Sequence, residues 1–373
     1  MTEENNNATI FYDKLMEFEK EKEKDITNEM FHYISSNGFP RLAIGVLGFK
    51  YLSPSILLRN MTPEHENAIL TQMIEITPSI VELIVAPLFT LNGTCNSCIT
   101  KHLNKYVINC RVVNYKLDRE KANHFIFPEG VNYFESKNVF LTFKDTLTEV
   151  EKEKVFKSKD GETGQVRGIE DIRVLSHKDE LYYVGTIFDD NKLVMTYGKY
   201  DENVAEIERN PIVSPYQRNQ EKNWAMFMYN EECHFVYRWF PLEIGKVVDG
   251  KLDIVYRRYY ENVPILKYFK GSSCGVLDEK NNVLWFLVHF HSENEFRQYY
   301  HAFVIMDAKT FELKAVSSPF TFEKQRVEFG MGLIVEEDRI IVSYTCFDQD
   351  ARVAVFSRVN IANLLFNSFG TIL

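Results

Sequence analysis

The sequence predicts a mainly β protein, a five-bladed β-propeller preceded by a helical N-terminal region. Phe, Tyr and Trp make up 14% of the 373 residues, a share typical of sheets whose faces pack on aromatic rings. After about residue 86 the chain consists of short strand-like segments joined by polar turns, and none of it resembles a long helix. Paired strands recur at roughly 45 to 55 residues, the length of a propeller blade. We therefore place a helical region at residues 1–85 and the propeller at residues 86–373.

The N-terminal region carries two helical patterns. Apolar side chains recur at helical spacing from Leu15 to Ile34, with charged residues between them, and Asn37-Gly38 provides a stop. A second helix is predicted to begin at Pro63, with Thr62 as its N-cap. These helices could cap the propeller, recruit a partner or join two copies into a homo-oligomer.

Ten strand-like segments follow, each rich in β-branched or aromatic residues. They span 105–115, 138–143, 180–188, 192–200, 233–240, 252–260, 282–290, 299–307, 339–347 and 351–359. Because no helix alternates with these strands, a parallel α/β fold is excluded, and a sandwich, a barrel or a propeller remains. The segments group into five units, at 106–142, 170–200, 224–260, 283–314 and 333–359, which favours the propeller.

Composition excludes several functional classes. The net charge of −10, from 43 basic and 53 acidic residues, argues against a nucleic-acid partner. No apolar run reaches the roughly 18 residues that span a bilayer, and the first residues show no secretory signal, so we expect a cytoplasmic protein without a membrane span. Frequent Asn, Lys and Ile are typical of AT-rich genomes such as those of large DNA viruses, for which the compartment would be the host cytoplasm.

The six cysteines give little sign of a metal site. Only Cys95 and Cys98 are closely spaced, and no second pair or histidine stands at metal-binding distance from them in the sequence. Neither a metal nor a cofactor is therefore expected.

Each unit carries polar residues in otherwise apolar surroundings, most of them near its start. In a propeller the innermost strands line a central funnel, so such side chains are expected to converge on one pocket. The candidates are Arg111 and Asn114 in the first unit, Glu170, Asp171 and Arg173 in the second, Lys222 and Asn223 in the third, Ser272 and His289 in the fourth, and Glu328 and Asp348 in the fifth.

A series of motifs runs through these units in order. It comprises GIEDIRV, EKNWAMF, VYRWFPLEIG, FKGSSCGV, LWFLVHF, RQYYHAFVIMD, VEFGMGL and SYTCFDQDARVAV. The series resembles that of the five-bladed β-propeller carbohydrate-active enzymes, nearest the branch of β-mannoside phosphorylases and mannosyltransferases and the related viral and bacterial glycosyltransferase-like propellers. The resemblance covers about residues 86–365. It implies a carbohydrate or glycan substrate, with phosphate or a nucleotide-sugar donor as the second reactant.

The resemblance also assigns roles to single positions. Glu170, Asp171 and Arg173 match the Glu-Asp-Pro-Arg motif of this branch, with an isoleucine in place of the proline. Lys222 and two further residues, Arg238 and His289, fall where the phosphorylases contact inorganic phosphate. A lysine, an arginine and a histidine that lie together would bind an anion through charge-assisted hydrogen bonds. This hypothesis requires that the three side chains share one site.

Other candidates have two interpretations. Arg297, Tyr300 and His301 could contact a sugar, whose face stacks well on an aromatic ring, or could simply pack between blades. The acidic residues beside Arg173 could form a structural ion pair that fixes the start of a blade. His289 lies on an apolar strand, where a buried structural histidine is the alternative.

The catalytic acid is where the sequence departs from the phosphorylases. They carry an aspartate shortly after a Tyr-Arg pair in the first blade, whereas Asp118 lies later in the matching stretch. Transfer from an activated donor depends less on such an acid, because the leaving group departs as a stabilised anion. We therefore favour a glycosyltransferase-like or phosphorylase-like enzyme that transfers a hexose, such as mannose, with Asp118, Glu170, Asp171 and Glu328 as catalytic candidates. A glycoside hydrolase and a non-catalytic sugar-binding or structural propeller remain as alternatives.

Overall fold

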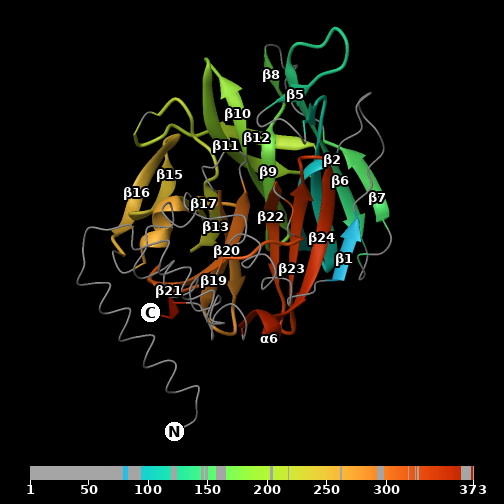
Figure 1. The fold of residues 1–373 in the computed structure, drawn as a ribbon. Helices are drawn as coiled ribbons and strands as arrows, with labels where there is room; N and C mark the ends of the chain where they lie inside the picture. Colours follow the sequence, from blue (N-terminus) through green and yellow to red (C-terminus); the bar gives the residue numbers. More distant parts are fainter. Residues whose placement is uncertain are drawn as a thin grey trace, which may run out of the picture.

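The computed structural model confirms a five-bladed β-propeller (Figure 1). It describes residues 79–82, 94–118, 124–143, 147, 150–156, 165–201, 205–216, 218–260, 263–291, 298–317, 319–323, 325, 327–362 and 371–372. The predicted N-terminal helices lie outside these residues. Within the described chain, no helix has the length and apolar character needed to cross a bilayer.

Each blade is an antiparallel sheet whose first strand faces the centre. Blade 1 consists of β2 (Thr94–His102), β3 (Lys105–Val113), β6 (Phe134–Phe143) and β7 (Val150–Val155). Blade 2 consists of β9 (Glu170–His177), β10 (Glu180–Asp189), β11 (Lys192–Tyr200) and β12 (Glu206–Pro211). Blade 3 consists of β13 (Ala225–Tyr229), β14 (Glu232–Trp239), β15 (Leu242–Val248) and β16 (Lys251–Arg258).

The last two blades are completed by strands from the two ends of the chain. Blade 4 contains β17 (Lys270–Gly271), β18 (Val276–Asp278), β19 (Val283–His291), β20 (Tyr299–Asp307), β21 (Leu313–Val316) and β25 (Thr371–Ile372). Blade 5 contains β22 (Glu328–Val335), β23 (Arg339–Cys346), β24 (Asp350–Ser357) and β1 (Ser79–Glu82). Figure 1 shows β1 beside the red strand β24, with which it pairs in antiparallel register. The strand from the N-terminal side therefore forms the outer edge of the fifth blade, and it lies before residue 86, where the sequence places the start of the propeller.

Short elements decorate this ring. A hairpin of β4 (Lys116–Leu117) and β5 (Phe125–Ile126) is inserted between β3 and β6, and β8 (Val166–Arg167) pairs in parallel with β6. The 3-10 helix η2 (Pro264–Tyr268) precedes β17, and the short helix α6 (Arg358–Ile361) follows β24.

Burial follows the position of a strand within its blade. Strand β3 is buried at all but its first residue, whereas the outer strands β7 and β16 are mostly exposed. Strands covered on both faces are expected to be continuously apolar, which is why the second and third strands of the blades were the easiest to predict. The innermost strand of blade 1 reads TCNSCITKH and was missed, because its polar residues line the centre instead of a core.

The high aromatic content packs the blades against one another. Phe227 of β13 meets Phe286 of β19 edge to face, with ring centroids 5.8 Å apart. Phe322 stacks on Tyr344 of β23 at 4.2 Å. Each such ring pair adds about 0.5–1.5 kcal/mol beyond the burial of its apolar area. At the centre the inner strands approach so closely that a Cβ on Gly332 of β22 would lie 2.1 Å from the backbone nitrogen of Ile99 in β2.

Candidate active site at the starts of the inner strands

The site contains two β-bulges, one in the inner strand of blade 1 and one in the inner strand of blade 2. In blade 1 Asn96 is the extra residue between Cys95 and Ser97, and in blade 2 the register shifts between Glu170 and Arg173 of β9, a stretch that includes Asp171. A bulge turns a side chain away from the regular alternation of a strand. Here the two bulged residues face each other, and Asn96 Nδ2 donates a hydrogen bond of 2.7 Å to Asp171 Oδ1. Asn96 Oδ1 is buried and has no hydrogen-bond partner among the described residues.

Asp171 is held in its ionised form. Its backbone has a φ of +55°, a left-handed conformation that Asp tolerates better than most residues. Burial by itself would raise the pKa of Asp171, but the charges of Arg111 and Arg173 and the bond from Asn96 outweigh it, so the pKa lies below its ordinary value. Arg111 contributes most directly, with its guanidinium 2.9 Å from Asp171 Oδ1.

Glu170 binds the two cations nearest to it. Its Oε1 accepts a hydrogen bond of 3.0 Å from Lys222 Nζ and lies 3.7 Å from Arg111. The Lys222 side chain is 38% exposed, the Glu170 side chain 23% and the Arg111 side chain only 7%. The sequence predicts a cationic pocket here, whereas the structure pairs each of these cations with a carboxylate.

Arg173 is committed to structural bonds. The side chain is fully buried, and its Nε donates to the carbonyl of Ser272 at 2.5 Å. A second nitrogen donates to Asn223 Oδ1 at 2.7 Å. Asn223 has a φ of +62°, so its backbone is also in the left-handed region. Arg173 therefore ties the inner strand of blade 2 to the segments that begin blades 3 and 4.

His289 extends this network into blade 4 as a neutral imidazole. Its Nδ1 lies 2.8 Å from Ser272 Oγ, and its ring stacks on Tyr299 at 6.2 Å. Burial, aided by neighbouring positive and imidazole groups, lowers the pKa of His289 well below its ordinary value. The uncharged ring can exchange hydrogen bonds with a hydroxyl group, but it supplies no positive charge for an anion.

Asp348 completes the cluster from blade 5. It lies in the turn between β23 and β24 with a φ of +52°, and its charge interacts with Arg111, Asp171, Glu170 and Lys222. The pKa of Asp348 is raised from 3.8 to about 6, mainly by burial; the neighbouring carboxylates also raise it, whereas Arg111 and Lys222 lower it. Asp348 and Asp171 thus have opposed pKa shifts within one charge cluster, and shifts of this kind distinguish a proton donor from its partner.

Two predicted catalytic residues, Glu328 and Asp118, have other partners. Glu328 is fully buried and accepts hydrogen bonds from the backbone N–H groups of Phe322, Glu323 and Gln325, so it holds that loop. Burial raises the pKa of Glu328 to about 7. Asp118 lies in the β4–β5 hairpin, where its carboxylate contacts His124 Nδ1 at 3.1 Å.

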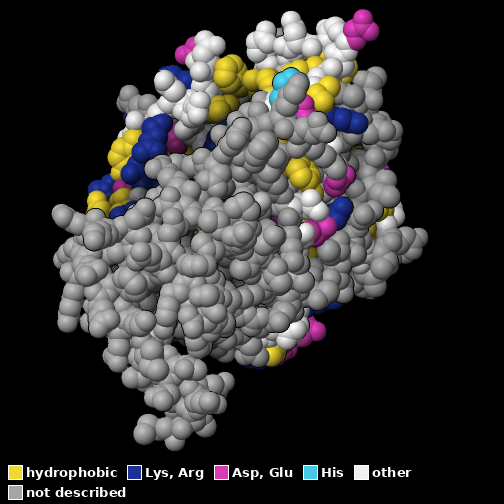
Figure 2. All heavy atoms as spheres, in the orientation of Figure 1, with side chains coloured by type: hydrophobic (Ala, Val, Ile, Leu, Met, Phe, Trp, Pro, Cys, Tyr) yellow, Lys and Arg dark blue, Asp and Glu magenta, His cyan; other side chains and the backbone are white. Residues whose placement is uncertain are grey.

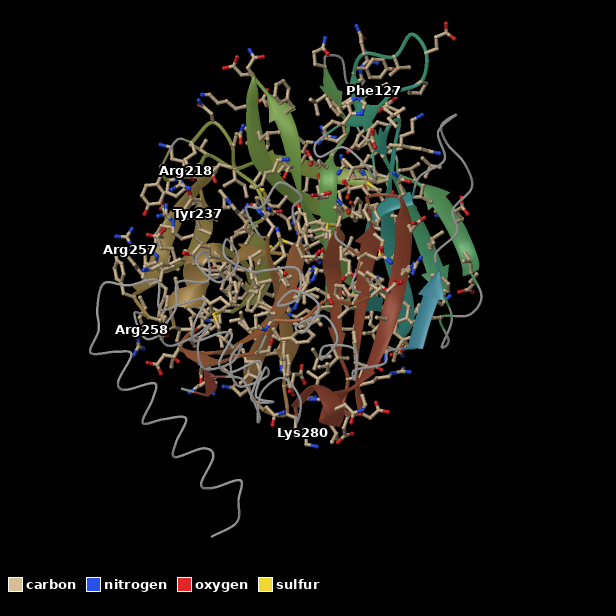
Figure 3. All side chains as sticks on the ribbon, in the orientation of Figure 1. Phe127, Arg218, Tyr237, Arg257, Arg258 and Lys280 are labelled. Carbon is tan, nitrogen blue, oxygen red and sulfur yellow. The ribbon has the colours of Figure 1, made fainter. Side chains whose placement is uncertain are left out.

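Arg238 belongs to a separate cluster in blade 3. Its Nε lies 2.9 Å from the buried Glu243, and its guanidinium covers the rings of Tyr216 and Tyr237. Figure 3 shows Tyr237 on the same side of the molecule as Arg257, which also pairs with Glu243. The three predicted phosphate contacts therefore do not form one group of cations: Lys222 is paired with Glu170, His289 is neutral and Arg238 lies in this cluster.

The remaining candidates lie in the core or outside the described chain. Tyr300 is 2% exposed and stacks on Phe290. His301 is fully buried and accepts a hydrogen bond from the backbone of Gly330, and burial lowers its pKa to about 3. Arg297 lies outside the described residues. Strand alternation explains this result, because it places Tyr299 beside His289 and turns Tyr300 to the opposite face of β20.

Sequence reasoning left out Ser136, one of two side chains that complete the site beside Arg111. Ser136 accepts a hydrogen bond of 2.8 Å from Arg111 Nε, and Tyr115 lies 3.4 Å from another nitrogen of the same guanidinium. Asn114, which was a binding candidate, instead bonds the backbone of Tyr133 and Glu135. The register of β3 with β6, which pairs Arg111 with Asn138 and Val113 with Ser136, is the signal that would have placed Ser136 near the site.

No metal centre is evident in the part of the chain that the structure describes. It contains no cluster of three or more His, Cys, Asp or Glu residues suited to a metal ion. Cys95 and Cys98 are buried free thiols, and burial raises the pKa of both. Cys98 bonds the backbone nitrogen of Val174 at 3.2 Å, a structural contact between blades 1 and 2.

Comparison with known proteins establishes the fold. No protein-family model and no curated protein matches the sequence. The structure is similar to the β-1,2-mannobiose phosphorylase of Listeria innocua in complex with β-1,2-mannobiose, with a TM-score of 0.55, 14% identity and coverage of 77% of this chain and 99% of that one. It is also similar to a putative glycosidase from Bacteroides thetaiotaomicron, with a TM-score of 0.53, 12% identity and coverage of 72% and 87%. A putative glycoside hydrolase from Bacteroides ovatus gives a TM-score of 0.50, 12% identity and coverage of 80% and 96%. The five-bladed fold implied by the motif series is thereby confirmed.

Proposed function

We propose that the protein is a carbohydrate-active enzyme that cleaves the glycosidic bond of a hexose by transfer to phosphate, or forms that bond in the reverse reaction with release of phosphate, with a β-mannoside as the first substrate class to test. The observation that carries this proposal is the charge cluster at the starts of the inner strands, where Glu170 and Asp171 pair with Lys222 and Arg111 and where Asp348 interacts electrostatically with all four. A proton donor and fixed carboxylates around one polar pocket are what glycosidic chemistry requires. The shared fold with a β-1,2-mannobiose phosphorylase supports the choice of substrate.

Asp348 is the proposed general acid. It would protonate the glycosidic oxygen as the bond to the anomeric carbon breaks, and its pKa of about 6 keeps part of the population protonated near neutral pH. Asp118 was the earlier candidate for this acid, but its carboxylate is paired with His124 in the hairpin. Asp348 takes the role of the acid in its place. Asp171 would accept a hydrogen bond from a hydroxyl group of the sugar, since Arg111 and Asn96 fix its carboxylate.

Lys222 is the proposed phosphate contact. Of the cations in the cluster its side chain is the most exposed, and an ion pair at such a position contributes only about 0–1 kcal/mol. Phosphate could therefore take the place of Glu170 at little cost. Arg173 is unsuited to this role, because its nitrogens are already bonded to Ser272, Gly271 and Asn223.

Hydrolysis is the second candidate, and the charge balance of the site favours it. Since Glu170 and Asp171 already neutralise Lys222 and Arg111, water could serve as acceptor where phosphate is excluded. The two activities differ in product, because phosphorolysis yields a sugar 1-phosphate and hydrolysis yields the free sugar.

The test is turnover of β-1,2-mannobiose with and without inorganic phosphate. We expect mannose 1-phosphate only when phosphate is present, and we expect Asp348→Asn to lower kcat by about 10²–10⁴-fold. Free mannose formed at the same rate without phosphate would establish the hydrolase instead. If a panel of mannosides, glucosides and nucleotide sugars gives no product above the Asp348→Asn control, the protein is not an enzyme of this class.

A further inference from the structure

The hairpin inserted in blade 1 stands beside the active site. Lys116 and Leu117 of β4 pair with Ile126 and Phe125 of β5, and the hairpin is attached to the site at two points. Tyr115, immediately before β4, contacts Arg111 through its hydroxyl at 3.4 Å. On the other side Gln349 Nε2, next to Asp348, donates a hydrogen bond of 2.9 Å to the carbonyl of Leu117. The hairpin is thus attached on one side through Gln349, the neighbour of the proposed acid Asp348, and on the other side through Arg111, which binds Asp171.

Aromatic rings form a fixed group on this hairpin. Tyr115 meets Phe125 at 5.1 Å and Phe134 at 5.3 Å, both edge to face, and Phe127 meets Phe134 at 4.9 Å. Phe125 also lies edge to face with Phe134 at 5.3 Å. Perpendicular contacts of this kind fix each ring against its neighbours, so the orientation of the group is set before any ligand arrives.

Part of the group is exposed. Phe125 is 38% exposed and the adjacent Ile126 is 45% exposed, although Tyr115 beneath them is buried. Figure 2 shows hydrophobic side chains along the upper edge of the molecule, beside a histidine, where Figure 1 places β5 and Figure 3 labels Phe127. A contiguous exposed apolar surface next to a polar site is typical of ligand recognition.

The polar surroundings of Phe125 identify the ligand class. The carboxylate of Asp118 lies 3.1 Å from His124 Nδ1 on the same hairpin, and Lys116 lies on the neighbouring strand, opposite Ile126. An apolar ring face bordered by a carboxylate and an imidazole group complements a pyranose, which has an apolar C–H face and a rim of hydroxyls. A lipid or a helix from another protein would require a wider apolar surface without this polar border.

We propose that the β4–β5 hairpin is a binding platform for the sugar residues of a glycan that lie beyond the one at Asp348. This inference rests on the proposed function, since it assigns the acceptor side of the same site. Phe125 contacts the sugar ring, and the Asp118–His124 pair binds its hydroxyls. Asp118 is therefore a residue of substrate specificity.

The test compares ligands of different length. Methyl β-mannoside occupies one sugar position, whereas a sulfur-linked β-1,2-mannotriose occupies three and resists cleavage. Isothermal titration calorimetry with the wild type, Phe125→Ala and Phe125→Leu would measure both affinities. Tyr259→Ala is the matched control, because Tyr259 is a 61% exposed aromatic residue that follows the outer strand of blade 3. The leucine variant keeps apolar bulk at the hairpin and separates loss of the ring from loss of the fold.

We expect both Phe125 variants to bind the mannotriose about three- to tenfold more weakly and to bind methyl β-mannoside unchanged, with no effect of Tyr259→Ala. Unchanged affinity of the Phe125 variants for the mannotriose would overturn the platform and leave the proposed function standing. An equal loss of affinity for both ligands in the leucine variant would also overturn it. If the wild type binds neither sugar, the proposed function fails and the platform fails with it.

Discussion

Asn96 and Asp171, which are 75 residues apart in the chain, are joined by a hydrogen bond of 2.7 Å between two β-bulges on the inner strands of neighbouring blades. The bond has two consequences. It lowers the pKa of Asp171 together with Arg111 and Arg173, and it fixes the spacing of blades 1 and 2 where the site is built. A regular strand in either blade would turn one of these side chains away.

Removal of this amide is expected to destabilise the protein. Asn96→Ala leaves an ionised, buried carboxylate with one partner fewer, which should lower the free energy of unfolding by about 1–3 kcal/mol. Urea unfolding at pH 7 would measure the change. Asn219→Ala is the control, because Asn219 is exposed. Equal stability of the two variants would show that the bond does not contribute.

The raised pKa of Asp348 predicts a specific dependence of stability on pH. Because its pKa rises from 3.8 to about 6 on folding, the folded protein binds more protons than the unfolded chain between these values. The contribution is present in full below about pH 4 and is lost as the pH rises through about 6. Asp348→Asn, which suits the same left-handed backbone, should therefore increase stability at pH 7.5 by about 1–2 kcal/mol and leave it unchanged at pH 4. Thermal unfolding at both pH values would test this, and a gain of the same size at pH 4 would contradict it.

The sequence predicts the ring of sheets far better than it predicts the site. Buried middle strands such as β19 and β23 have continuous apolar sequences, so their positions follow from composition and turn residues. The direction of a side chain at the centre depends on bulges and left-handed residues, which leave no periodic pattern. Asp171 and Asp348 were predicted as site residues by their position in motifs, and the bulge that aims Asp171 at Asn96 could be seen only in the structure.

Arg173 shows the limit of reasoning from residue type. Its match to the carbohydrate-enzyme motif and its charge made it a candidate for substrate binding, yet its nitrogens bond Ser272, Asn223 and nearby backbone. An arginine can bind an anion only if its N–H groups do not already donate hydrogen bonds to carbonyl groups of other blades. The sequence order of the blades does not reveal those contacts.

Substitution of Arg173 should therefore affect folding more than binding. Arg173→Met removes a fully buried charge whose partners, the Ser272 carbonyl and the Asn223 amide, are left without a donor. We expect a loss of about 3–5 kcal/mol in the free energy of unfolding. Arg218→Met, at an exposed position, is the control and should change stability by less than about 0.5 kcal/mol. Retained stability of Arg173→Met combined with weaker substrate binding would indicate that Arg173 contacts the ligand.

The pair of Glu170 and Lys222 provides the clearest test of the proposed phosphate contact, because phosphate and Glu170 should compete for the same ammonium group. Glu170→Gln removes the competing charge from Lys222 and also from Arg111, so phosphate should bind about two- to fivefold more tightly. Lys222→Ala should have the opposite effect. Calorimetric titration with inorganic phosphate would measure both, with Glu180→Gln as control, since Glu180 forms an exposed pair with Lys199 in blade 2. If Glu170→Gln leaves phosphate affinity unchanged or weakens it, Lys222 is a structural partner of Glu170, and phosphate is not bound at this site.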